Sequence, residues 1–378
     1  MIVAQQCVPL QPDALRQQLE AWQARWPSLG VMALVPEAEH AQVAVLQATA
    51  NALNVALVGA VFPALVTDTG FATSGVCLLC FAQAPAYVLA DQLEQQGDVR
   101  LAHALQDLLR GDAAEPLTLF TVFDAMVPNI GSLMESVHLA LDGERHYVGV
   151  SAGSETFQPM SCLFDNQRLV GNGVLALLLP DAPKAVVRHG YAVSKSLCSA
   201  TSAVGNRIAL IDDRPAFSVY QEVIRQEYGV ALTAENFYEL AVHFPFGVVT
   251  AVDVLVRIPV SLGEDGSLYC VGEIPERSML RLLSAPRWEH SSCVADIQDE
   301  LAVAGVPGQP ASLLTFYCAG RRMHFGTHAA DELAQLRQAS GCSAMFGALS
   351  LGEMDSLEEF MFPRFHNAAI VCMPQPAA

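Results

Sequence analysis

Short apolar segments alternate with amphipathic segments along the first part of this sequence, and this alternation limits the folds that the chain can adopt. The apolar runs Val31–Val35, Ala56–Val61 and Leu117–Val122 have the length and composition of buried strands. Around them, segments such as Asp13–Trp26 and residues 40–53 repeat apolar residues at helical spacing. This order of strands and helices predicts an α/β layer in which some strands pair in parallel.

The chain becomes strand-rich from Tyr147 to Leu210 and then begins a second α/β unit. Asp212-Asp213, followed by Pro215, indicates a helix start with an acidic cap and a proline in the first turn. Further strands are expected at Gly247–Val256, Leu268–Val271, Leu313–Cys318, Ala344–Leu349 and Ala368–Met373.

We therefore predict a mixed α/β (α+β) fold of two closely packed domains, each with a mixed β-sheet flanked by helices. The predicted boundaries give a helical lead-in at residues 1–30, a first domain at 31–215 and a second domain at 216–378. No internal sequence repeat is evident.

The composition narrows the class of protein. Hydrophobic residues make up 52% of the chain and charged residues 16%, which allows sizeable cores and excludes a disordered protein. The net charge of −19, without a run of basic residues, excludes nucleic acid as a partner. The start of the chain lacks the basic head and apolar core of a secretory signal, and apolar runs such as Gly173–Pro180 are too short to cross a bilayer. We expect a cytoplasmic protein with no membrane contact, whose ten cysteines are mainly reduced and buried.

One motif suggests a hydrolase. Gly149-Val-Ser151-Ala-Gly153 fits the Gly-x-Ser-x-Gly nucleophile elbow and follows a predicted strand. The next residues, Ser154 to Pro159, are a poor helix start, and no later histidine is marked as a partner by its local sequence. A tight glycine turn after a core strand is therefore the favoured interpretation.

Two groups of residues have metal-like spacing. Cys77 and Cys80 lie three apart in an apolar strand, so they point to opposite faces and are better interpreted as core cysteines. Cys318, His324 and His328 could approach one another, because the two histidines share a helix face. The glycine between those histidines and the missing acidic residue favour a polar loop instead.

His243 is the most informative isolated histidine. It lies in His243-Phe-Pro-Phe-Gly247, and an imidazole beside Phe244 has the apolar walls and basic nitrogen that a haem iron ligand needs. The alternative is a partly buried histidine at a domain junction, and the residue pattern on its own favours that alternative.

Several short motifs follow one another in a definite order. In the first half they are Gly149-Val-Ser151-Ala-Gly153, Val170-Gly171-Asn-Gly173-Val174, His189-Gly190-Tyr191 and Asp212-Asp213-Arg-Pro215-Ala216. In the second half they are Phe244-Pro245, Val256-Arg257, Asp265-Gly266-Ser267-Leu268, Cys318-Ala-Gly-Arg321, Gly352-Glu353 and His366-Asn367. In these residues and their order the chain resembles the FIST family of bacterial ligand-sensing modules.

The resemblance implies a sensor rather than an enzyme, one that regulates a partner histidine kinase or a cyclic-di-GMP enzyme. It departs from the family at Val58-Gly59-Ala-Val-Phe62-Pro63, where the family usually carries Gly-x-Thr-Thr-x-Gly-Glu. Phe62 and Pro63 would remove polar contacts from a pocket there and add a wall for a large apolar ligand. This change, with the lack of an output domain, makes the chain similar to the haem-binding nitric oxide sensing branch called NosP.

That resemblance implies a non-covalent b-type haem whose iron binds nitric oxide. The expected metal ligand is His243, followed by His189 and His366, with Phe244 and Phe62 as apolar walls. Arg321 or Arg322 would pair with the propionates. A second copy of the chain is a further candidate partner. The alternatives that remain open are a sensor for a small polar ligand such as an amino acid, without haem, and a hydrolase that uses Ser151.

Overall fold

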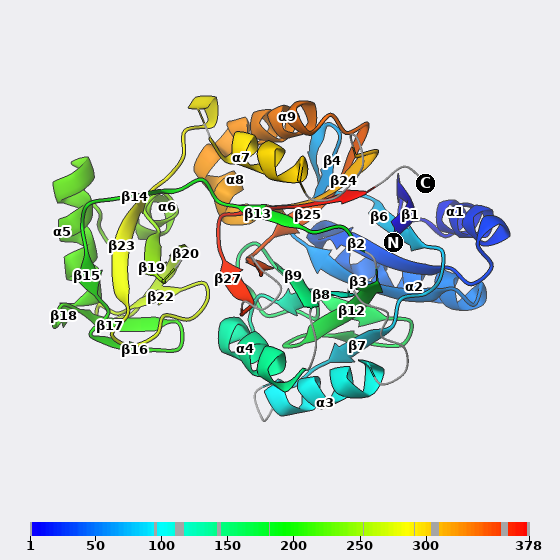
Figure 1. Cartoon of the computed structure of the whole chain (residues 1–378), viewed down its shortest axis with the longest axis horizontal. Coiled ribbons are helices and arrows are strands. Elements are labelled where there is room, and N and C mark those ends of the chain that lie inside the picture. Colours follow the sequence, from blue (N-terminus) through cyan, green and yellow to red (C-terminus); the bar gives the residue numbers. More distant parts are fainter. Residues whose placement is uncertain are drawn as a thin grey trace.

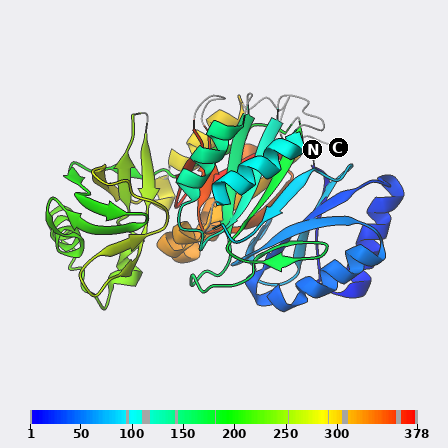
Figure 2. The same cartoon turned by 90° about the horizontal axis from the view of Figure 1, so that it is seen from below.

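The computed structural model describes residues 2–93, 97–109, 117–141, 145–180, 182–251, 253–290, 292–303, 310–356 and 362–375. The chain forms a mixed α/β fold in two parts, which confirms the predicted fold class. We call residues 2–191 and 286–375 the body and residues 192–285 the lobe. The lobe stands to one side of the body (Figures 1 and 2). The chain enters the lobe after Tyr191 and leaves it after Ala285. No helix in the described ranges is long and apolar enough to span a bilayer.

The body contains three βαβ units, each with a central pair of parallel strands. The first unit is β2 (Gly30–Pro36), α2 (Val43–Ala52) and β3 (Ala56–Phe62); the second is β8 (Leu117–Asp124), α4 (Ile130–Ala140) and β9 (Arg145–Ala152); the third is β24 (Ser312–Cys318), α9 (Ala329–Ser340) and β25 (Ala344–Ser350). An antiparallel strand flanks each pair: β6 (Val76–Phe81), β12 (Val174–Pro180) and β28 (Ile370–Gln375).

Each unit is completed by a hairpin that follows a different unit in the chain. The hairpin β4 (Leu65–Thr67) and β5 (Gly70–Ala72) follows the first unit and pairs with β25 of the third. The hairpin β10 (Leu163–Asp165) and β11 (Leu169–Val170) follows the second unit and pairs with β3 of the first. The hairpin β26 (Glu353–Asp355) and β27 (Arg364–His366) follows the third unit and pairs with β9 of the second. The exchange closes a ring, so strands from both sides of the predicted boundary at 215/216 share sheets.

The remaining elements cover the sheets or build the lobe. In the body these are β1 (Ile2–Val8), α1 (Pro12–Arg25), η1 (Glu37–Gln42), β7 (Tyr87–Ala90), α3 (Gly97–Leu109), β13 (Val186–Arg188), η2 (Trp288–His290), α7 (Ser292–Leu301), α8 (Ala319–Phe325) and η3 (Gly326–His328). In the lobe they are β14 (Ala192–Val193), β15 (Cys198–Ser199), β16 (Ser202–Val204), β17 (Arg207–Ile211), β18 (Arg214–Pro215), α5 (Ala216–Tyr228), α6 (Phe237–Ala241), β19 (Phe246–Val249), β20 (Val254–Arg257), β21 (Pro259–Leu262), β22 (Leu268–Cys270) and β23 (Met279–Ser284).

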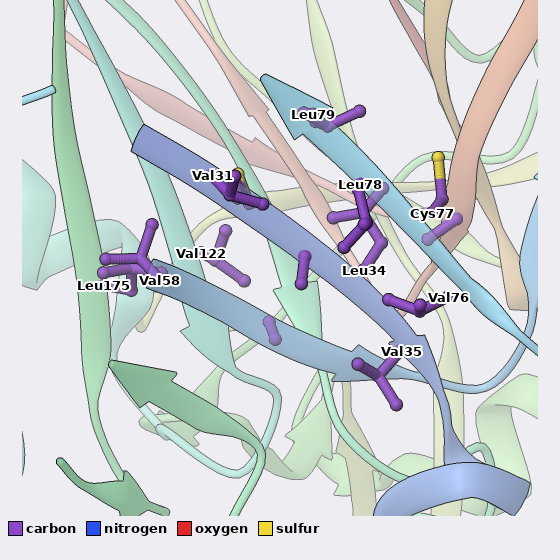
Figure 3. Packing of buried hydrophobic residues seen from close by; sticks show 14 of the residues in the cluster. Val31, Leu34, Val35, Val58, Val76, Cys77, Leu78, Leu79, Val122 and Leu175 are labelled. Carbon is purple, nitrogen blue, oxygen red and sulfur yellow. The ribbon is translucent and has the colours of Figure 1, made fainter. Parts of the chain in front are cut away.

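The largest core lies where the sheets of the body face one another. Figure 3 shows Val31 and Leu34 of β2 packed with residues of β6, and Val122 and Leu175 close by. Phe62 is fully buried in this core, with its ring centroid 5.8 Å from that of Phe316. The residue predicted to wall a ligand pocket therefore contributes to the packing between the first and third units.

The three units meet along β3, β9 and β25, where close approach requires glycine. A Cβ atom on Gly347 of β25 would lie 1.8 Å from the carbonyl oxygen of Thr315 on the adjacent β24, and the residue has a φ of 154°. No side chain fits at this distance without moving the backbone of β24.

We predict that Gly347→Ala lowers the free energy of unfolding by about 3 kcal/mol or prevents folding, because the added methyl group forces the two central strands apart. Gly229→Ala is the matched control. Gly229 ends α5 at a φ of 68°, and its Cβ would meet nothing within 4 Å, so only backbone strain of about 1 kcal/mol is expected there. Urea unfolding measures both variants, and equal losses would contradict the argument.

Candidate functional site

Polar side chains gather where the hairpin β26–β27 faces the lobe. Glu353 lies directly opposite His366, and Asp355 lies directly opposite Arg364. Because alternate residues of a strand point to the same side, these four side chains share one face of the hairpin. Met354 and the other apolar residues of the hairpin contribute to a core cluster. All four polar residues are buried, with exposed fractions of 8% or less.

Glu353 stabilises the turn that follows β27. Its carboxylate accepts hydrogen bonds from Ser350 Oγ at 2.5 Å and from the amide of Ala369 at 3.0 Å. Burial raises the pKa of Glu353 to about 7, although these hydrogen bonds favour the ionised form. The carboxyl group therefore changes its protonation state near neutral pH.

Cys318 supports the same turn from the end of β24. Its Sγ accepts a hydrogen bond from the amide of Ala368 at 3.1 Å, and Ala368 has a φ of 57°. The second unit has the same arrangement, because Asp124 at the end of β8 accepts a hydrogen bond from the amide of Asn172, whose φ is 45°. A side chain at the end of the first strand of the unit thus stabilises a left-handed residue in both units.

Gly352 allows the hairpin to contact the lobe. A Cβ on Gly352 would lie 2.3 Å from the ring of Phe365, so glycine is required for the ring to pack there. Arg257 of the lobe lies 5.7 Å from the centroid of this ring and donates to the carbonyl oxygen of Phe365 at 2.7 Å. The amide of Ile258 donates to Asn367 Oδ1 at 3.1 Å. The Gly352 and Asn367 motifs therefore join the lobe to the body.

Arg321 forms a buried ion pair instead of facing a cavity. Its Nε and Nη2 donate to Glu332 at 2.7 and 2.5 Å, and both side chains are fully buried. Its Nη1 donates to the carbonyl oxygens of His189 and Ala368 at 2.5 and 3.2 Å. Tyr317 Oη completes the cluster with a 2.6 Å hydrogen bond to Glu332. The guanidinium predicted to bind an acidic ligand thus connects β24, α9 and the connection to the lobe.

A cavity of about 380 Å³ lies at the junction of body and lobe, lined by residues of β13 and the connection that follows it, of α7 (Ser292 and Asp296), of the lobe itself and of the hairpin β26–β27. The rings of His189 and His366 lie on its wall with centroids 6.1 Å apart. His189 Nδ1 accepts from the amide of Tyr191 at 3.0 Å, which places its hydrogen on Nε2. Burial, with His366 as the next cause, lowers the pKa of His189 to about 4, so the ring is neutral at neutral pH.

Arg364 and His366 leave polar atoms without partners at this cavity. Arg364 Nε and Nη2 donate to Asp355 at 3.0 to 3.2 Å, whereas Nη1 lies 3.6 Å from Asp253 Oδ2 of the lobe. His366 Nε2 lies 3.3 Å from Asp355 Oδ1. Burial alone would raise the pKa of Asp355, but His366 and Arg364 hold it below its ordinary value. Arg364 Nη1 and both ring nitrogens of His366 are buried and have no hydrogen-bond partner among the described residues.

This arrangement suits a small molecule that both accepts and donates hydrogen bonds. Arg364 Nη1 and His189 Nε2 are donors, and the Asp253 carboxylate is an acceptor. Buried polar groups ordinarily have partners, so the unsatisfied atoms of Arg364 and His366 mark this cavity as the candidate binding site. His189 and His366 were predicted from the sequence as candidate iron ligands, whereas Arg364, Asp355 and Asp253 were not predicted as site residues. The only local signal was polar residues flanking a hairpin, and eight residues separate Asp355 from Arg364.

His243 and Phe244 lie at the end of α6 in the lobe, apart from this cavity wall. His243 Nδ1 lies 2.6 Å from Nδ1 of His324 on α8. His324 Nε2 lies 3.1 Å from the carbonyl oxygen of Pro286, so its hydrogen is on Nε2 and His243 Nδ1 is the donor of the pair. Burial lowers the pKa of both rings, that of His324 to about 4. Phe244 packs on Tyr228 with centroids 4.9 Å apart.

The other candidate groups are not brought together. His328 stacks on Trp288 and contacts Asp331, and Arg322 forms an ion pair with Glu155. Cys318, His324 and His328 thus have separate partners, and no set of three metal-binding side chains occurs within the described ranges. Ser151 lies inside β9, one residue before its end, and the strand is followed by bends and the hairpin β10–β11, so the strand-to-helix turn of a nucleophile elbow is lacking here.

Comparisons with known proteins identify both halves of the chain. The FIST N domain matches residues 28–214, and the FIST C domain matches residues 216–355. Together the two matches span most of the 378 residues. No curated protein matches the chain.

We predict that Glu353→Gln changes the pH dependence of stability. The folded pKa of Glu353, about 7, lies above its ordinary value of 4.5, so wild-type stability falls as pH rises between these values and the loss is complete above pH 7. Glutamine does not titrate, so the unfolding free energy of the variant relative to wild type should rise by roughly 3 kcal/mol across this window. Urea unfolding at pH 5 and pH 8 measures the difference, and a constant difference would contradict a raised pKa.

Proposed function

The chain belongs to the FIST family, and from that premise we propose that it is a signal-transduction sensor that binds a small polar ligand between body and lobe. One observation carries the choice of site: Arg364 and His366, which line the junction cavity, hold buried polar atoms without a hydrogen-bond partner, namely Arg364 Nη1 and both ring nitrogens of His366. Its volume of about 380 Å³ lies within the range of about 300–1,000 Å³ that is typical of small-molecule pockets.

The polar lining supports a ligand with two kinds of group. An oxyanion would accept from Arg364 Nη1 and His189 Nε2, while an ammonium or hydroxyl group would donate to Asp253. An amino acid has both groups on a small skeleton. We therefore propose an amino acid or a similar dipolar metabolite as the ligand, and a role in sensing rather than catalysis.

The place of the cavity supports a mechanism for signalling. Gly190 and Tyr191 belong to one of the two connections between body and lobe, and both line the cavity. A ligand held by Arg364 of the body and Asp253 of the lobe would favour one orientation of the lobe over others. We propose that a partner protein, a histidine kinase or a cyclic-di-GMP enzyme, responds to that orientation.

Haem with nitric oxide is the function that the sequence favoured, with the small polar ligand as its alternative, and the residues near the proposed haem ligand do not fit haem in this conformation. The cavity at Val242, the neighbour of His243, has a volume of about 40 Å³, far below the size of a small-molecule pocket. His243 Nδ1 is also engaged by His324. Haem binding at His243 therefore stays a prediction.

We predict that Arg364→Gln weakens binding of the ligand at least tenfold, because a charge-assisted hydrogen bond is lost. The ligand would first be found as an amino acid or dipolar metabolite that raises the melting temperature of the wild-type protein. Titration calorimetry then compares the two proteins.

Arg168→Gln is the matched control for that experiment. Arg168 pairs with Asp165 across the hairpin β10–β11 as Arg364 pairs with Asp355, but it does not line the cavity. This variant should bind as wild type does. Equal weakening in both variants would show a general effect on stability, and a screen without any stabilising ligand would remove the proposed class.

The haem prediction is tested by an absorption spectrum after haem reconstitution, with and without nitric oxide under anaerobic conditions. On the geometry above we expect weak, sub-stoichiometric binding without a defined Soret band. A stoichiometric Soret band that shifts with nitric oxide and is lost in His243→Ala would favour haem over the polar ligand.

A further inference from the structure

We propose that Cys7 and Cys77 form a redox-reactive dithiol, in which a peroxide oxidises Cys7 and Cys77 then closes a reversible disulfide. The proposal does not depend on the ligand cavity. It rests on the pairing of two strands at the edge of the body. It also rests on the difference in solvent exposure and in thiol pKa between Cys7 and the other cysteines.

Strand pairing places the two cysteines face to face. β1 pairs antiparallel with β6, and Cys7 lies directly opposite Cys77 in the register. Directly opposite residues of antiparallel strands have Cα atoms about 4.5–5.5 Å apart and side chains on the same face. Disulfides span Cα distances of about 4.4–6.8 Å, so the pair can be joined without moving either strand.

The two thiols differ in access to solvent. Cys7 is the one exposed cysteine of the ten, all of which lie within the described ranges, and Cys77 is fully buried. Cys198 is partly buried and the other cysteines are buried. An oxidant in solution therefore meets Cys7 first, and Cys77 lies behind it as the resolving thiol.

The chemistry of Cys7 matches this order. A hydrogen bond from the Cys77 thiol lowers the pKa of Cys7, against the opposing effects of burial and of the Asp68 charge. The same interaction, together with burial, raises the pKa of Cys77. Burial raises the pKa of each of the other eight cysteines. For example, it raises the pKa of Cys80 to about 11 and that of Cys198 to about 12. The accessible thiol is thus also the one that ionises most readily.

The reaction balances with the peroxide as the two-electron oxidant. The Cys7 thiolate attacks one peroxide oxygen, the O–O bond breaks, and the leaving oxygen takes a proton from solvent to give water or an alcohol. Cys7 is then a sulfenic acid. The sulfur of Cys77 attacks Cys7 and loses its proton, the S–O bond breaks, and water leaves. Two thiols have been oxidised to one disulfide.

The disulfide would fasten an outer strand. β1 is the last strand of its sheet, and β6 is its strand partner within the described ranges. Outer strands separate from a sheet more readily than inner strands do. Oxidation would therefore link β1 covalently to β6, and reduction would release it, which makes the N-terminal strand sensitive to redox conditions.

The experiment treats the reduced full chain with a few equivalents of hydrogen peroxide, blocks remaining thiols with an alkylating agent, and maps peptides by mass spectrometry. We expect a Cys7–Cys77 linked peptide that dithiothreitol removes. We also expect Cys7 to react at least about tenfold faster than Cys198. Cys7 and Cys77 that both stay alkylated while other cysteines oxidise would overturn the proposal, as would a disulfide between the Cys7 residues of two copies.

Variants separate the two roles. Cys7→Ser should abolish the linked peptide, and Cys77→Ser should leave Cys7 as a sulfenic acid that dimedone traps. Cys80→Ala is the matched control, because Cys80 is also a buried cysteine of β6 but lies opposite Ala4. It should form the linked peptide as wild type does. If Cys77→Ser fails to fold, Cys77→Ala and the wild-type kinetics still decide the outcome.

Discussion

The body depends on the exchange of hairpins among its three βαβ units. β25 is paired with β24 of its own unit on one side and with β4, from the other end of the chain, on the other side. β3 and β9 are completed in the same way by β10 and β26. Because each hairpin completes a unit other than the one that it follows, a single unit would expose the edge of its parallel pair. The units are therefore expected to fold cooperatively, with much of the pairing formed over long sequence separation.

The hairpin that follows the third unit carries an aspartate–arginine pair like that of the hairpin that follows the second unit, but in a buried position. In the pair Asp165–Arg168 on the hairpin β10–β11 and in the pair Asp355–Arg364 on β26–β27, the arginine donates from Nε and Nη2 to the aspartate. The side chain of Arg168 is 47% exposed, whereas that of Arg364 is 9% exposed beneath the lobe. Burial turns a surface ion pair of small energetic value into one that constrains its surroundings. The candidate site is thus a repeated structural element that the inserted lobe has enclosed.

Periodicity in the sequence predicted local elements well, because it depends on which residues are buried. The segment Val31–Val35 lies within β2, and the predicted helix at residues 40–53 contains α2. The single strand predicted at Gly247–Val256 is wrong: β19 and β20 form a hairpin there, with a turn closed by Thr250 and Asp253. Both strands are apolar and the turn between them lacks glycine and proline, so the sequence has the pattern of one continuous strand. The likeness of the three βαβ units could not be predicted from the sequence, because it lies in the pairing of the backbone. Side chains at corresponding positions, such as Asp124 and Cys318, differ. The role of Arg364 depends on the pairing of β26 with β27 and on the position of the lobe. A local sequence pattern predicts neither of these.

The contact between lobe and body is suited to movement because the buried charge of Arg257 forms no ion pair within the part of the chain that the structure describes. Arg257 is buried and donates to the carbonyl oxygens of Val256, Glu273 and Phe365. Burial lowers its pKa to about 10, so the group stays charged at neutral pH at some cost in solvation. Carbonyl oxygens compensate a buried cation less well than a carboxylate does, and this offsets part of the energy gained by packing on Phe365. A junction of this kind is held with a modest net energy, so the ligand that we propose beside it would need only a few kcal/mol of differential affinity to change the position of the lobe.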